Sequence, residues 1–137
     1  MTVAAAFAFT WLGLVLGISF LEAPLKFRAP GVTLQLGLGI GRLVFAALNR
    51  VEVLLAIAVW VALLTGHRST APTAAVGVVV LILIVQLIAV RPALTRRSDR
   101  VLAGEEVSRS RAHLVYVGLE VAKVVGLAGL GVTAPAG

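Results

Sequence analysis

The segment 112–131, AHLVYVGLEVAKVVGLAGLG, constrains the fold of this chain more than any other. It is long enough to cross a bilayer, which requires about 20 apolar residues in a helix. It also carries His113, Tyr116, Glu120 and Lys123. On a helix these four side chains lie within about 80° of one another and form one polar stripe. Because a charge at membrane depth costs about 2.5 kcal/mol or more, we expect the stripe to face away from lipid.

The composition indicates that a bilayer is the solvent of this chain. Of its 137 residues, 60% are hydrophobic and 13% are charged, and the mean hydropathy is +1.06. A soluble domain is about 45–50% apolar and about 25% charged. We therefore expect an all-α, polytopic membrane protein, a single domain over 1–137 with four transmembrane helices in one bundle. The predicted spans are about 3–22, 43–66, 70–90 and 112–131, with a basic cytoplasmic loop at 91–111.

Two boundaries need further argument. Residues 22–31, EAPLKFRAPG, hold two prolines and three charges, which predicts that the first helix ends there. The uncharged stretch 53–66 is too short to span alone. The second helix must therefore start near Arg42 or Leu43. In residues 33–41, apolar residues alternate with glycine, a pattern that resembles a strand. A helix or a re-entrant piece is favoured, because lipid offers no hydrogen-bond partners to the backbone of an open strand. The loop 91–111 suggests a surface helix or a hairpin extension.

The charges predict orientation and exclude several functions. Twelve Lys and Arg against six Asp and Glu give a net charge of +6. Most basic residues flank apolar segments, which predicts cytoplasmic basic loops, both termini outside and a multi-pass protein of the cell (inner) membrane. This pattern explains the charge without nucleic acid as a partner. The absence of cysteine excludes disulfides and thiolate metal sites, and two histidines without an acidic cluster argue against a metal site. No catalytic motif is present, so we expect neither an enzyme nor a cofactor.

The second, third and fourth spans bring polar groups to one depth. At about 1.5 Å per residue, Glu52 and Glu120 both lie about 10–12 Å inside the cytoplasmic face. Pairing of Arg50 with Glu120, or of Glu52 with Lys123, would neutralise charges that lipid cannot solvate, and Glu120 and Lys123 can also pair within their helix. Arg50 points about 160° from Glu52, so it can instead reach another neighbour or snorkel to the interface. The candidate residues for a ligand or ion pathway are Glu120, Lys123, Glu52, Arg50, Asn49, Gln86, Tyr116 and His113.

These residues admit a structural and a functional interpretation. They form either a buried ion-pair network that fixes helix register or a polar pathway or pocket for an ion, proton or small solute. His113 is favoured as an interface residue over a haem ligand, Tyr116 as an interfacial anchor, and Trp11 as a lipid or packing contact. We expect transport or small-ligand or ion binding. The alternatives are a non-catalytic structural or assembly subunit of a larger membrane complex and, more weakly, a haem- or quinone-associated redox accessory. Besides the bilayer, the expected partner is a second copy or a larger complex.

Short motifs at the helix ends resemble those of a known family. They are Gly41-Arg42-x-x-Phe45 at the start of the second span, Arg91-Pro92 after the third, His113 at the start of the fourth, and Pro24 with Phe27 after the first. This layout resembles the small four-span membrane proteins of the transmembrane protein two-hundred-five type and their bacterial relatives. The resemblance implies a four-helix membrane fold and carries over no activity. The resemblance assigns no role to the pair Glu120 and Lys123.

Overall fold

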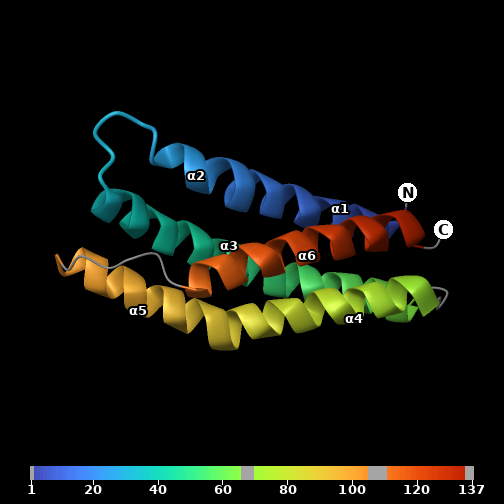
Figure 1. Ribbon diagram of the computed structural model, residues 1–137. Coiled ribbons are helices and arrows are strands. Elements are labelled where there is room, and N and C mark those ends of the chain that lie inside the picture. Colours follow the sequence, from blue (N-terminus) through green and yellow to red (C-terminus); the bar gives the residue numbers. More distant parts are fainter. Residues whose placement is uncertain (1, 66–69, 105–110, 135–137) are drawn as a thin grey trace.

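The computed structural model describes residues 2–65, 70–104 and 111–134, and all regular structure in these ranges is helical. Four long helices run side by side, and both termini lie at one end of the bundle (Figure 1). All four are long and apolar enough to cross a membrane, as the sequence predicted. Residue 66 of the predicted second span and residues 105–110 of the predicted loop lie outside the described residues. In chain order, the elements are α1 (Val3–Val15), η1 (Leu16–Glu22), α2 (Ala23–Lys26), α3 (Leu34–Thr65), α4 (Thr70–Val85), η2 (Gln86–Val90), α5 (Arg91–Leu102) and α6 (Arg111–Thr133).

Each helix buries one stripe of side chains. Helix α6 packs against both α1 and α4, and α1 also packs against α3. Buried positions in the helices recur at alternating steps of four and three residues, the spacing that keeps one face of a helix against its neighbours in a bundle. In α6 these positions are Tyr116, Glu120, Lys123, Leu127 and Leu130, and in α4 and η2 they are Pro72, Val76, Val79, Leu83, Gln86 and Val90.

The first helix ends within residues 22–31, as the two prolines and the nearby charges predicted, but four residues later than the predicted boundary at residue 22. The helix runs on through η1 and α2 to Lys26. A proline has no N–H, and its ring clashes with the carbonyl four residues earlier. A π turn relieves this clash by moving each hydrogen bond to the carbonyl five residues back. The residue before each proline makes such a bond, Ala23 to Ile18 before Pro24 and Arg91 to Gln86 before Pro92.

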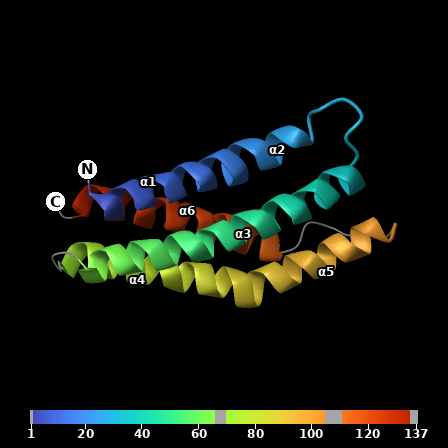
Figure 2. The ribbon, with the colours of Figure 1, turned by 180° about the vertical axis from the view of Figure 1, so that it is seen from behind.

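The π turn η2 likewise lets the third helix continue past Pro92. Residues 91–102, the start of the predicted basic loop, are therefore a direct continuation of that helix. Helix α3 is also longer than expected, because residues 34–41 continue the helix instead of forming a separate re-entrant piece. Its 32 residues span about 48 Å, against about 30 Å for a hydrocarbon layer. Helix α3 and the third long helix, which ends with α5, therefore extend past the start of α6, at the end away from the termini (Figure 2). We name this end, which holds α2, the start of α3, and α5, the basic end.

Candidate functional site

A lysine at the centre of the bundle holds three helices together. The Lys123 Nζ lies 2.5 Å from Glu52 Oε1, 2.6 Å from Glu120 Oε1 and 2.8 Å from Gln86 Oε1. An ammonium group has three N–H donors, so each one finds an acceptor. All four side chains are at most 2% exposed. Both pairs that the sequence suggested for Lys123 are therefore present, and Gln86 joins them.

Two residues of the first helix complete this arrangement. Trp11 Nε1 donates a hydrogen bond to Glu52 Oε1 at 2.9 Å, and Ser19 Oγ donates to Glu120 Oε2. The Gln86 amide also donates to Glu120 Oε1, at 2.9 Å. We call these six residues the buried cluster: Trp11, Ser19, Glu52, Gln86, Glu120 and Lys123.

Trp11 is packed in the core, as one sequence interpretation has it, but it also donates a hydrogen bond, and Ser19 is a polar member of the cluster that the sequence pattern did not indicate. Both residues lie on the buried face of the first helix, which also carries Ala4, Ala8 and Val15. The indole N–H is the only polar atom of tryptophan, and it usually finds a partner when buried. The signal that could have found Ser19 is its spacing of eight residues from Trp11, which places the two side chains on one helix face.

The remaining candidate residues divide into two groups. Arg50 is exposed, and the carboxylate of Glu120 binds Lys123, so the suggested Arg50–Glu120 pair does not form. Asn49, His113 and Tyr116 instead line a cavity next to the buried cluster. The prediction that Tyr116 is an interfacial anchor is wrong, because its side chain is buried in the bundle. The ring of Phe45 contacts it edge to face, with 5.8 Å between the ring centroids.

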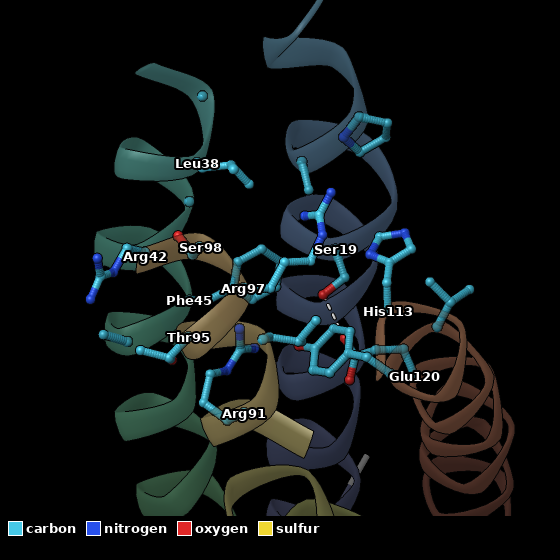
Figure 3. A pocket seen from close by; sticks show the side chains of 18 of the residues that line it. Ser19, Leu38, Arg42, Phe45, Arg91, Thr95, Arg97, Ser98, His113 and Glu120 are labelled. Carbon is cyan, nitrogen blue, oxygen red and sulfur yellow. Dashed lines mark hydrogen bonds between the residues drawn. The ribbon is translucent and has the colours of Figure 1, made fainter. Parts of the chain in front are cut away.

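The cavity has a volume of about 710 Å³ and lies at the basic end. Figure 3 shows side chains from the first, second and third long helices, together with His113 and Glu120 of α6, around this space. The cavity exists because α6 begins part-way along the bundle while the other three helices continue beyond it (Figures 1 and 2). Its polar lining consists of Ser19, Lys26, Arg42, Asn49, Arg91, Thr95, Arg97, Ser98, His113, Tyr116 and Glu120.

Arg91 is held in the wall of this cavity by two aromatic rings. Its guanidinium carbon lies 4.9 Å from the ring centroid of Phe45 and 4.8 Å from that of Tyr116. These are cation–π distances, and such contacts hold the cation without neutralising it. Two of its nitrogens, Nε and Nη2, are buried and have no hydrogen-bond partner among the described residues.

Two further groups of the cavity wall are buried without a partner in the described ranges, the Ser98 hydroxyl and the Tyr116 hydroxyl. The side chains of both residues are less than a tenth exposed. A buried polar group that makes no hydrogen bond costs about 1–3 kcal/mol. The lining of the cavity thus includes three side chains with unpaired buried polar atoms, counting Arg91.

Two basic residues of the cavity lining form ion pairs with carboxylates outside it. Arg42 Nη1 lies 2.7 Å from Asp99 Oδ1 and links α3 to α5, while Lys26 lies 3.7 Å from Glu22 within the first helix. Both pairs are partly exposed. Such pairs contribute about 0–1 kcal/mol each, so they position the walls more than they stabilise them.

Within the described ranges, no group of three His, Asp or Glu side chains lies close enough together to hold a metal ion. Comparison with protein-family models, with curated proteins and with solved structures finds no match to this chain. The resemblance to the transmembrane protein two-hundred-five type stays a prediction.

Proposed function

We propose that this protein is a membrane protein that binds a small ligand in the cavity at its basic end. The supporting observation is the combination of the 710 Å³ volume with the unpaired polar groups of Arg91, Ser98 and Tyr116 in its wall. Ligand sites typically measure about 300–1,000 Å³ and combine mostly apolar walls with a few polar groups that fix the orientation of the ligand. The aromatic and aliphatic parts of this wall include Phe20, Phe27, Leu38, Phe45 and Leu94.

The distribution of basic residues supports entry of the ligand from the cytoplasm. Lys26, Arg28 and the arginines of α5 all belong to the basic end. The excess of basic residues in cytoplasmic loops would place this end inside the cell and both termini outside. The ligand would then come from the cytoplasm or from the inner leaflet.

A substitution that fills the cavity tests the proposal. Ala46 lines the cavity, and the adjacent Ala47 is exposed and does not line it. The protein is extracted in mild detergent, and native mass spectrometry measures any small molecule that remains bound. We expect the wild type and Ala47→Trp to retain a bound molecule and Ala46→Trp to lose it. A wild type without bound mass, or equal retention by both variants, would contradict ligand binding in this cavity.

Transport is a second candidate, and one observation favours it. Glu120 lines the cavity and also belongs to the buried cluster, so a solute in the cavity is next to a carboxylate bound to Lys123. Proton or solute flux into liposomes should then change in Glu120→Gln or Glu52→Gln while the helical content stays the same. Unchanged flux in a folded variant would exclude transport through the cluster and leave binding intact. No feature of the described residues favours the assembly-subunit or redox-accessory alternatives, which stay predictions.

A further inference from the structure

We infer that the cavity takes an anionic amphiphile, with a phosphate or carboxylate group on an apolar body, and that Arg91 pairs with the acid group. This inference rests on the proposed binding function and adds the chemical class of the ligand. It follows from the charge of the cavity wall, from the geometry of Arg91 and from the level of the cavity along the bundle.

The wall of the cavity is cationic. Among the described lining residues, four side chains are Lys or Arg, and Glu120 is the one carboxylate. Both oxygens of that carboxylate already accept hydrogen bonds from inside the buried cluster. Asp99 pairs with Arg42, whereas Arg91 has no acidic partner among the described residues. An anion would therefore gain more from this wall than a cation or a neutral molecule.

The geometry of Arg91 selects an acid group. The Nε–H and one Nη2–H of a guanidinium point to the same side, and this edge binds two oxygens of a carboxylate or phosphate at once. In Arg91 these are the two nitrogens without a partner. The rings of Phe45 and Tyr116 lie against the guanidinium, which limits its motion. The Tyr116 and Ser98 hydroxyls in the same wall offer two further donors.

The position of the cavity explains why the acid should carry an apolar body. Helix α6 has 23 residues, about 35 Å, which is close to the thickness of a hydrocarbon layer. The cavity lies beside its first turns, near His113, at the level where the hydrocarbon of a bilayer spanned by α6 would meet the polar headgroups. Basic pockets between membrane helices at this level bind acidic headgroups, and the rings of Phe20 and Phe27 provide an apolar wall.

The test compares amphiphiles that differ only in the head. The full chain in nanodiscs of phosphatidylcholine is titrated with dodecyl phosphate or with dodecanol, and binding is measured by native mass spectrometry. The wild type should bind dodecyl phosphate about tenfold or more tightly than dodecanol. Arg91→Gln should lose this preference, and Arg91→Lys should retain only part of it. Arg96→Gln removes one charge from an exposed position on the same helix, outside the cavity, and should behave like the wild type.

The outcomes separate the inference from the proposed function. The inference that the ligand is anionic is overturned if the wild type binds dodecyl phosphate and dodecanol equally, or if Arg91→Gln keeps the preference for the phosphate. If Ala46→Trp still abolishes binding of both, the cavity remains a binding site. If Arg91→Gln does not fold, the wild-type comparison and Tyr116→Phe, expected to weaken phosphate binding severalfold, decide. Displacement of dodecyl phosphate in phosphatidylglycerol nanodiscs supports a lipid headgroup as the source, and its retention supports a free amphiphile.

Discussion

Replacing Lys123 by methionine tests whether the buried cluster holds the bundle together. The change keeps the length of the side chain and removes the ammonium group. In the native protein, Lys123 Nζ lies within 2.6 Å of a carboxylate oxygen of both Glu52 and Glu120. The variant therefore leaves these two carboxylates without their shared cation. Both carboxylates are at most 1% exposed, so water cannot take the place of the lysine.

The expected loss in the free energy of unfolding is about 3–5 kcal/mol, the cost of removing one partner from a buried ion pair. An ordinary hydrogen bond between membrane helices contributes less, about 0.6 kcal/mol on average and at most about 2 kcal/mol. Because the two ranges do not overlap, the measured loss distinguishes a buried ion-pair network from an ordinary hydrogen bond between helices. Protein domains are stable by about 5–15 kcal/mol, so the variant should be close to unfolding.

Reversible denaturant unfolding in mixed micelles, followed by circular dichroism, measures this loss. Lys26→Met is the matched control, because Lys26 pairs with Glu22 at 3.7 Å and its partner is about a third exposed. The control should lose about 0–1 kcal/mol. Adding Glu52→Gln and Glu120→Gln to Lys123→Met removes both unpaired charges and should restore most of the stability. If Lys123→Met costs no more than Lys26→Met, the cluster does not hold the helices together.

Two smaller substitutions test the packing around the cluster. Gly126→Ala would place a methyl group 2.7 Å from Cγ2 of the buried Val79, whereas Gly129→Ala meets nothing within 4 Å. We expect a loss of about 1–3 kcal/mol for the first and none for the second, by the same unfolding assay, and equal losses would contradict the close contact of α6 with α4. Trp11→Phe removes the donor to Glu52 and should cost about 1–3 kcal/mol. If that variant unfolds at the wild-type denaturant concentration, the indole N–H contributes nothing beyond packing.

Much of the fold and part of the cluster could be predicted from the sequence. Four apolar stretches require helices, because lipid cannot satisfy any other backbone conformation of a single span. Glu52 and Lys123 have no solvent at their depth, so their pairing follows from electrostatics before any packing is known. The prediction that polar groups of the second, third and fourth spans lie at one level is confirmed by the contacts of Lys123, because the rise of a helix is constant.

The cavity and the two π turns could not be predicted in the same way. A proline such as Pro24 can end a helix or widen one turn, and the outcome depends on whether neighbouring helices stabilise the continuation. The cavity depends on where α6 begins relative to the other helices, and this register is set by the packing of whole helices. In the sequence Arg91 is one of several interfacial arginines, and its position in the cavity wall between Phe45 and Tyr116 distinguishes it from Arg96.

The buried cluster also sets a limit on what the cavity can do. On the side of Lys123 toward the termini, the core is closed by Trp11, Val59, Val79 and Leu127, none of which is exposed. A solute that moved from the cavity toward the termini would have to break the three hydrogen bonds of Lys123 and then separate these side chains. Both steps would occur without water to replace the lost contacts, so their costs add. Binding from the basic end requires neither step, because the cavity lies on that side of the buried cluster. We therefore expect ligand exchange at the basic end to persist in variants of the cluster that remain folded, whereas passage across the bundle would require α6 to move away from α1 and α4.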